Sequence, residues 1–428
     1  MTAITGIPGL DTRIDRAAFY AGDYHATFAA LRRADPFHWQ PETEMWLITR
    51  HADIRQIASD TRRFSNNYGV TVGSHAIARA IAGSGEDPAR SWRLAEVRRE
   101  IGRRSSAAPD VDNLQSLDPP AHAALRKALA GSFTPRVISR IEDRVRELTR
   151  LTLEEVNPGE VADFMDIIAV PVPIYVIAEL LGVDKQDRDA FRRWSDVVIG
   201  AVEPKSEHER AKDADQFAEM FSYFREQAEL RRRAPREDLL TLLVQAQVGG
   251  DRLGSALVET LAKLILSAGN ETTRSGIAGS ALALARHPDQ RQVLLDSPEL
   301  IEGAVNEFLR WTTPVRAFCR TATEDMQYGD RPIRRGDFVA LSYVSANRDE
   351  RAWPDPERFD VRREISPMHL SFGHGPHVCL GQTLARIEIK VVVEELLAHF
   401  PAFELAGEPI EIASTMVHGY DALPMRLA

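Results

Sequence analysis

The long segment from Ser255 to Arg286 constrains the fold of this chain more than any other feature. Read as a helix, it is apolar on nearly all sides. A helix at a protein surface keeps one polar face, so a helix without one belongs in the interior, surrounded by other elements. Its midpoint, Ala268-Gly269-Asn270, forms helix poorly, which a purely structural helix would avoid. The segment therefore predicts a central, buried helix.

Helical patterns dominate the rest of the chain. Asp118 stands before two prolines as the expected N-cap of one helix, and Cys379 is expected to open the last long helix. Strand patterns are few and late: Thr321–Tyr328, a run that begins at Phe338, and a hairpin that turns at His418. We predict a mostly α-helical protein with a small β portion. Because no repeat or long linker divides the sequence, we expect a single domain over residues 1–428.

Charge and cysteine content exclude several classes of protein. The 428 residues hold 53 Lys and Arg against 63 Asp and Glu, which disfavours a nucleic-acid binder because such a protein needs a basic face. Cys319 and Cys379 are too few for a disulfide scaffold, and they fit a reducing compartment. The sequence shows no signal peptide and no apolar stretch long enough to cross a bilayer. We expect a soluble, cytoplasmic protein with no nucleic-acid or membrane partner.

The strongest chemical signal is the run Phe-Gly-His-Gly-Pro-His-Val-Cys-Leu-Gly at 372–381. Gly373 and Gly375 let the backbone fold tightly and approach a flat object closely. The run delivers Cys379 to the expected start of a helix, where free N–H groups and the helix dipole favour a thiolate. A lone thiolate cannot form a closed zinc site. The pattern therefore indicates a metal that brings its own further ligands, namely haem iron.

This loop resembles the haem-binding loop of the cytochrome P450 family, F-G-x-G-x-[HR]-x-C-x-G, and matches it at every fixed position. The resemblance implies the family fold, a triangular helical prism with a long central helix over the haem. It also implies haem b as the cofactor, Cys379 as the axial iron ligand, and contacts to the haem from Phe372, Gly373 and Gly381. The alternative is a buried structural cysteine after a glycine turn.

Two further motifs fit the same family. Glu307 and Arg310 form E-x-x-R, and they share one helix face. The resemblance implies a buried triad that Arg358 completes, whereas a surface ion pair is the alternative. Residues 268–273 match A-G-x-[DE]-T-[TS], which implies that Glu271 and Thr272 form the acid–alcohol pair that delivers protons to dioxygen. A threonine can instead bond back to the preceding helical turn.

The resemblance also implies which side chains bind the two haem propionates. His122 and Arg126 lie on one face of an expected helix. With Arg320 and His377 they would supply the cations that buried carboxylates require. A solvated His–Arg pair is the alternative for the first two residues.

Positions that match the family's substrate contacts are mostly apolar. They are Leu264, Ser267, Ala268, Val315, Ala317, Phe318, Met416 and Val417. With so few polar groups, they predict a lipophilic substrate of the terpenoid, steroid or aromatic hydrocarbon class. We expect the long segment Asn66–Gln115 to supply part of the pocket roof.

The reaction implied by the resemblance is monooxygenation, the insertion of one atom of O2 into the substrate. No flavin or iron–sulfur segment is fused to the chain, so electrons are expected from NAD(P)H through a ferredoxin reductase and a ferredoxin. Arg386, with Lys127 and Arg63, would offer a positive face to an acidic ferredoxin; ordinary solvated side chains are the alternative.

Two other functions compete with this reading. One is a peroxygenase that uses peroxide directly, which has little need of a proton relay such as Glu271 and Thr272. The other is a non-catalytic haem-thiolate binding protein. The complete set of catalytic positions and the lack of an effector domain in the sequence count against it.

Overall fold

The computed structural model describes residues 10–75, 114–130, 135–200 and 207–428. The α-helices are α1 (Ala17–Tyr20), α2 (Tyr24–Ala34), α3 (His51–Ser59), α6 (Ala121–Ala130), α7 (Pro135–Glu154), α8 (Pro171–Leu181), α9 (Arg188–Gly200), α10 (Glu207–Arg233), α11 (Leu239–Gln245), α12 (Ser255–Arg286), α13 (Pro288–Asp296), α14 (Ile301–Thr312), α15 (Tyr343–Ala346) and α16 (Gln382–His399). Shorter 3-10 or π turns lie at 165–169, 185–187, 298–300 and 375–377.

The strands are short. They are β1 (Phe37–Gln40), β2 (Met45–Ile48), β3 (Phe64–Ser65), β4 (Val161–Asp163), β5 (Gln247–Val248), β6 (Asp251–Arg252), β7 (Ala317–Ala322), β8 (Met326–Tyr328), β9 (Arg331–Ile333), β10 (Phe338–Ser342), β11 (Phe403–Leu405), β12 (Ile410–Glu411), β13 (Tyr420–Ala422) and β14 (Pro424–Leu427). The prediction of a mostly helical protein with a small β portion is confirmed. That the whole chain forms one domain stays a prediction.

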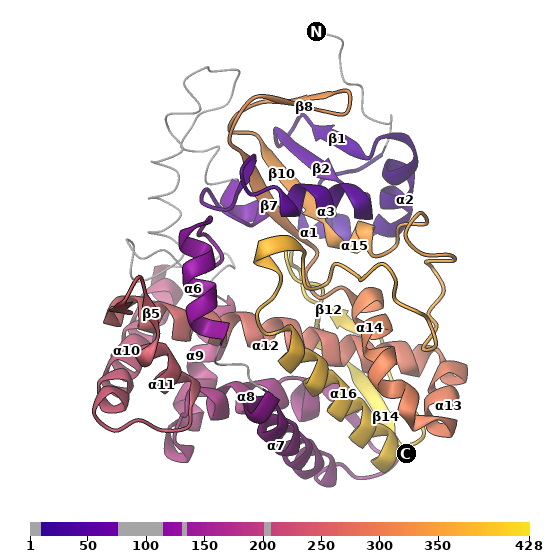
Figure 1. Cartoon of the computed structure of the whole chain (residues 1–428). Helices are drawn as coiled ribbons and strands as arrows, with labels where there is room; N and C mark the ends of the chain where they lie inside the picture. Colours follow the sequence, from indigo (N-terminus) through magenta and orange to yellow (C-terminus); the bar gives the residue numbers. More distant parts are fainter. Residues whose placement is uncertain (1–9, 76–113, 131–134, 201–206) are drawn as a thin grey trace.

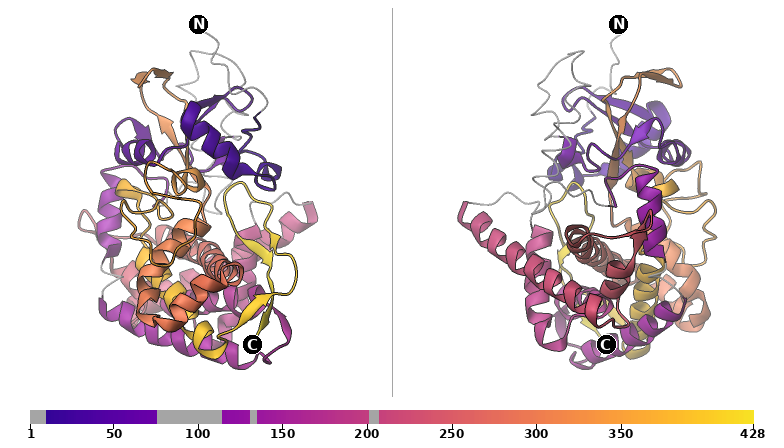
Figure 2. Two further views of the ribbon diagram at one scale, coloured as in Figure 1. Left: turned by 90° about the vertical axis from the view of Figure 1, so that its right-hand side faces the viewer. Right: turned by 60° about the vertical axis from the view of Figure 1, so that its left-hand side comes forward.

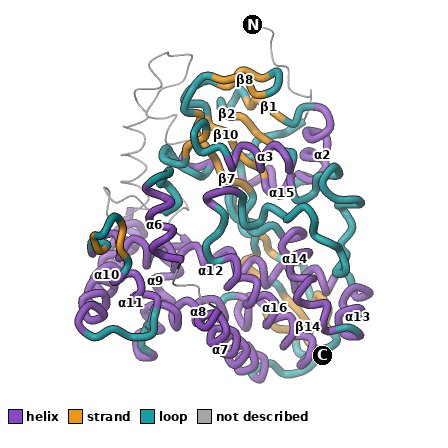
Figure 3. The backbone as a smooth tube through the Cα atoms, in the orientation of Figure 1, coloured by secondary structure: helices purple, strands orange, loops and turns teal. Residues whose placement is uncertain are grey.

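Strands and helices gather in two lobes, with the main sheet at the top of Figure 3 and most of the helices below it. The main sheet has the order β1-β2-β10-β7-β3. Its strand β10 runs parallel to β2 and antiparallel to β7, with Val339 opposite Arg320. A second sheet, β11-β14-β4, lies beside the helices near the C-terminus.

Helix α12 is the centre of the helical lobe, as the sequence predicts. It contacts α8, α9, α10, α14 and α16, and Figure 2 shows it nearly end-on among the surrounding helices. Gly269 allows one of these contacts, because a Cβ atom there would lie 2.8 Å from the side chain of Ile177 on α8. Among the described residues, no helix combines the length and apolar character that a membrane span needs.

Asp118 takes part in the predicted N-cap only through its backbone carbonyl, because its carboxylate binds residues outside the helix. Its carbonyl accepts the first helical bond, from the N–H of His122 at 3.0 Å. Its carboxylate, however, accepts hydrogen bonds from the N–H of Asn66 and the Nδ2 of Asn67, each at 2.9 Å, and from the Ser65 hydroxyl. The carboxylate therefore fixes the start of α6 to strand β3, which sets the position of His122.

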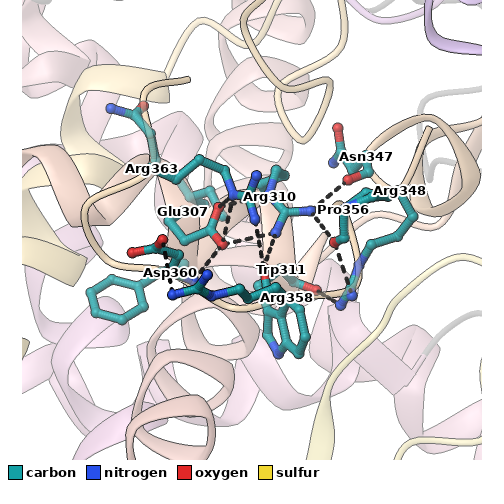
Figure 4. A network of polar contacts seen from close by, with 12 residues as sticks. Glu307, Arg310, Trp311, Asn347, Arg348, Pro356, Arg358, Asp360 and Arg363 are labelled. Carbon is teal, nitrogen blue, oxygen red and sulfur yellow. Dashed lines mark hydrogen bonds and ion pairs between the residues drawn. The ribbon is translucent and has the colours of Figure 1, made fainter. Parts of the chain in front are cut away.

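Glu307 and Arg310 form the buried pair that the E-x-x-R pattern predicts, and both side chains are fully buried. The guanidinium donates from Nε to Oε2 at 2.6 Å and from Nη2 to Oε1 at 2.8 Å. Its Nη1 donates to the carbonyls of Asn347 and Pro356, each at 2.9 Å. These bonds attach α14 to two loops that lie far away in the sequence (Figure 4).

The second arginine at Glu307 is Arg363, so the prediction of Arg358 is wrong. Arg363 places Nε 3.3 Å from Glu307 and is 10% exposed. The Arg358 side chain is 62% exposed and lies 3.7 Å from Asp360. The chain turns at this point so that the Arg358 carbonyl faces inward, where it accepts hydrogen bonds from Arg310 at 3.2 Å and Arg363 at 2.7 Å.

This correction can be tested by stability measurements. Arg363→Met removes a nearly buried partner of Glu307 and three donors to carbonyls, so we expect a loss of about 2–3 kcal/mol in the free energy of unfolding. Arg358→Met leaves its carbonyl in place and should cost less than about 1 kcal/mol. Urea unfolding of both variants measures the difference; equal losses would contradict the assignment.

Candidate active site

The loop at 372–381 is held by its own backbone and by the residues before it. The N–H of Cys379 donates to the carbonyl of Phe372 at 2.9 Å, which closes the loop. Asn347 anchors its start: the Asn347 Oδ1 accepts from the N–H of Leu370 at 2.7 Å, and its Nδ2 donates to the Ser371 hydroxyl at 2.9 Å. The Arg310 network therefore continues, through Asn347, into the cysteine loop.

The two glycines that the sequence analysis singled out are needed for the loop's shape. Gly373 and Gly375 have φ values of 70° and 73°, in the left-handed region that disfavours side chains. A Cβ atom on Gly375 would lie 2.5 Å from the carbonyl oxygen of Ala58, at the end of α3. The loop thus packs its backbone directly on the β lobe.

Cys379 lies in the turn before α16 rather than at its first residue, since the helix begins at Gln382 with Gly381 as N-cap. The side chain is exposed, yet the protein packed around the loop raises the pKa of the thiol by desolvation. The Gly381 N–H, Arg126 and Arg386 act in the opposite direction. The surroundings alone therefore do not favour the thiolate as predicted; a bound metal cation would do so.

Next to this loop lies a cluster of nitrogen donors from three elements. The rings of His122, on α6, and His377 lie against each other with their centres 3.9 Å apart and their planes tilted by 34°. Neither nitrogen of His122, nor Nε2 of His377, has a hydrogen-bond partner among the described residues. Arg126 follows His122 on α6. Arg320 lies on β7, is 3% exposed, and donates a hydrogen bond to the carbonyl of Cys319 at 2.8 Å.

Burial lowers the pKa of both imidazoles. Desolvation and then His122, Arg320 and Arg126 bring the pKa of His377 to about 3. Desolvation and then Arg126 lower the pKa of His122. Buried nitrogens without partners beside two guanidiniums form a donor set that is suited to anionic oxygen ligands. In the described residues no group of three or more His, Cys, Asp or Glu side chains is placed to hold a metal. Cys379 and these donors therefore fit a metal cofactor that carries its own ligands and carboxylates.

The predicted proton-relay residues, Glu271 and Thr272, lie in the middle of α12, one helical turn after Ala268. Ala268 is exposed, although Leu266 and Asn270 beside it are buried. The Thr272 hydroxyl donates to the carbonyl of Ala268 at 2.8 Å, so the bond back to the preceding turn is formed. Its oxygen can still accept a hydrogen bond.

Two contacts at this place were missed from the sequence. Arg274 pairs with Glu271 at 2.7 Å, and the i,i+3 spacing was a signal that could have revealed it. Asn270 donates from Nδ2 to the Ser195 hydroxyl of α9 at 2.5 Å, with both side chains fully buried. Nothing in the local sequence pairs these two residues, because they are 75 positions apart.

The predicted substrate contacts fall into separate groups. Val315 and Val417 meet in a β-bridge, and the Met416 carbonyl accepts the N–H of Arg316 at 2.8 Å, so the segment after α14 and the C-terminal hairpin lie side by side. The remaining positions differ in surroundings: Ala317 is buried, Phe318 packs near Tyr343, Leu264 packs toward α6 and α11, and Ser267 is partly exposed. Residues 76–113 of the expected roof lie outside the described residues.

The three cations expected to face a ferredoxin have different surroundings. Lys127 is exposed beside Arg126. Arg386 lies over the Phe372 ring at 4.5 Å and bonds Gln382 at 3.1 Å. Arg63 is paired with Asp60. Lys127 and Arg386 therefore lie near the cysteine loop, and the charge of Arg63 is offset.

Comparison with known proteins identifies the family. The family model described as Cytochrome P450 matches residues 177–416, more than half of the chain. Linalool 8-monooxygenase of Pseudomonas putida is 33% identical over 92% of this chain and 93% of its own length. Steroid C26-monooxygenase of Mycolicibacterium smegmatis is 33% identical over 91% of this chain and 87% of its own.

A solved structure supports the same assignment. Cytochrome P450 CYP109E1 from Bacillus megaterium, in complex with corticosterone, has a TM-score of 0.80 and 27% identity over 95% of this chain and 98% of its own. The chain belongs to the cytochrome P450 family, whose members use haem iron, and it is a cytochrome P450 monooxygenase.

The backbone geometry of the loop yields a test. Gly375→Ala places a side chain at positive φ and against the Ala58 carbonyl, so we expect the free energy of unfolding to fall by at least about 2 kcal/mol. Gly303→Ala is the control: it is exposed within α14, its Cβ would meet nothing, and it should stabilise by up to about 1 kcal/mol. Urea unfolding followed by circular dichroism measures both; a tolerated Gly375→Ala would contradict this packing.

Proposed function

We propose that Cys379 is the axial thiolate ligand of haem b. The proposal rests on an exposed cysteine, in a loop whose turns depend on glycines, beside a cluster of buried ring nitrogens that have no hydrogen-bond partner among the described residues. His122, Arg126, Arg320 and His377 would bind the two propionates, because two of them are cations and both imidazoles have ring nitrogens without a hydrogen-bond partner among the described residues. Phe372, Gly373 and Gly381 would hold the ring through the close approach of the loop.

We further propose that the enzyme hydroxylates a lipophilic molecule of the terpenoid, steroid or aromatic hydrocarbon class. Its relatives include a linalool monooxygenase and a steroid monooxygenase. The apolar side chains of Val315 and Val417, which lie side by side in a β-bridge, suit such a substrate. In the balanced reaction, one oxygen atom enters a C–H bond and the other leaves as water, with two protons and two electrons consumed.

The electrons would come from NAD(P)H through a ferredoxin reductase and a ferredoxin. The exposed Lys127 and the Arg386 side chain near the cysteine loop support an acidic partner on that face. Haem, when bound, supplies the activation of dioxygen.

The chain's own part in the reaction is to position the substrate and to move protons. Glu271, held by Arg274, would take up and release protons through its carboxylate. The Thr272 hydroxyl directs its own hydrogen to the Ala268 carbonyl, so its oxygen would accept a hydrogen bond from the group that delivers the proton and hold that group in place. Asn270, anchored on Ser195, keeps this part of α12 fixed to α9.

The ligand assignment is tested by the spectrum of the reduced protein with carbon monoxide. Wild-type protein should show a Soret band shifted far to the red, as thiolate ligation produces. Cys379→Ser should lose that band. Cys319→Ser, at a fully buried position on β7, should keep the band in the fraction of the variant that folds. A histidine-type spectrum in the wild type, or the same red-shifted band in Cys379→Ser, would overturn the proposal.

The proton-relay assignment is tested by coupling. Thr272→Ala should keep haem and substrate binding but divert reducing equivalents to peroxide, so product formed per NAD(P)H falls severalfold; Thr272→Ser should stay near wild type. The assay uses a surrogate ferredoxin system. An unchanged ratio in Thr272→Ala would refute the relay, and turnover that needs only added peroxide would favour the peroxygenase alternative.

A further inference from the structure

A cavity of about 720 Å³ opens in a part of the molecule that contains none of the cysteine loop. It is bounded by α1, α2, the C-terminal end of α12 and the residues around β12 and β13. Its volume lies within the range that small organic ligands occupy. The proposed haem site does not use it.

Arg316 is the more deeply buried of two buried arginines that line this cavity, with 1% of its surface exposed. Its Nε donates to the Val417 carbonyl at 3.0 Å, and its guanidinium lies 4.0 Å from the centre of the Tyr20 ring. Its Nη1 has no hydrogen-bond partner in the part of the chain that the structure describes. The Glu411 carboxylate is 3.8 Å away, too far for a hydrogen bond. A buried charged donor left without an acceptor is costly, so an acceptor is expected here.

The other charged and titratable side chains that line the cavity differ in how deeply they are buried. Arg348 is 5% exposed; it binds Glu357 at 2.8 Å and lies 3.6 Å over the Trp311 ring (Figure 4). His25 also lines the cavity, and its Nδ1 has no partner among the described residues. Both glutamates are half exposed, at 46% for Glu411 and 54% for Glu357. Arg316 and Arg348 are therefore inside, whereas the two carboxylates and the exposed Arg286 lie at the rim.

We propose that this cavity binds a small organic carboxylate with a flat apolar body. The planar guanidinium of Arg316 matches a carboxylate group, and the aromatic rings of Tyr20 and Trp311 suit a flat body. A single negative charge fits better than two, because Arg316 offers one guanidinium group with an unpaired donor and the Glu411 carboxylate, 3.8 Å from it, would repel additional negative charge.

The cavity shares a wall with the proposed substrate site. Arg316 stands between Val315 and Ala317, and its N–H and side chain hold the carbonyls of Met416 and Val417. A carboxylate bound to Arg316 would therefore shift the guanidinium and the Val417 carbonyl that it binds. Because this segment is proposed to line the substrate pocket, the apparent affinity for substrate should change. This coupling rests on the proposed function, whereas the binding site does not.

The test measures binding of benzoate to the haem-loaded enzyme by calorimetry. Benzamide, which has the same shape without charge, should bind at least about tenfold more weakly, as the loss of one charge-assisted hydrogen bond predicts. Arg316→Gln should weaken benzoate binding by a similar factor. Glu411→Gln removes a repelling charge and should strengthen it severalfold. Glu404→Gln is the matched control, because Glu404 is 71% exposed on β11, outside the cavity, and should change nothing.

Each outcome decides the proposal. No benzoate binding at about 10 mM to either the wild type or Glu411→Gln overturns it. The proposal is also overturned if Glu411→Gln binds benzoate with wild-type affinity, or if benzoate and benzamide bind equally well. Both comparisons remain possible even if Arg316→Gln fails to fold. A Soret shift on adding benzoate, unchanged by these variants, would place the binding at the haem instead. Benzoate binding as expected, with no effect on substrate affinity, supports the site and removes the coupling; absence of haem would refute the proposed function alone.

Discussion

The buried pair of Glu307 and Arg310 is the interaction on which the rest of the site depends. Two opposite charges without access to water hold together only when their remaining donors and acceptors are also satisfied. Arg310 meets that requirement with carbonyls of Asn347 and Pro356, and Arg363 adds a further contact to Glu307. Satisfying one ion pair thus fixes two loops against α14. Asn347 then passes this order to Leu370 and Ser371, immediately before the cysteine loop.

The proposed cofactor site illustrates how function and stability are set against each other. Both ring nitrogens of the buried His122 and the Nε2 of the half-buried His377 have no hydrogen-bond partner in the described part of the chain, and burial lowers the pKa of each imidazole. Such a cluster is unfavourable for the polypeptide alone and becomes favourable when an anionic group binds it. The Cys379 thiol is in a similar situation. Its surroundings raise its pKa, and a bound metal cation would lower it by stabilising the thiolate.

The segment after α14 has two faces with different chemistry. Val315 pairs with Val417 on one side, and Arg316 turns into the charged cavity on the other. Extended chains alternate their side chains in this way, so one short segment can serve two sites. The same residues that shape an apolar pocket are therefore held in place by a buried cation.

Local sequence patterns were enough to predict the central helix from Ser255 to Arg286, the glycine-rich loop before Cys379 and the Glu307–Arg310 pair. These features depend on local periodicity, glycine conformation and i,i+3 spacing, which a sequence states directly. Packing between distant segments settles three other contacts: Arg363 rather than Arg358 approaches Glu307, the Asp118 carboxylate binds Ser65 and Asn66, and Asn270 donates to Ser195. Several arginines of a loop are equivalent in sequence, and which one points inward is fixed by how the chain turns. Contacts between residues 50 or more positions apart depend on packing that no local pattern encodes.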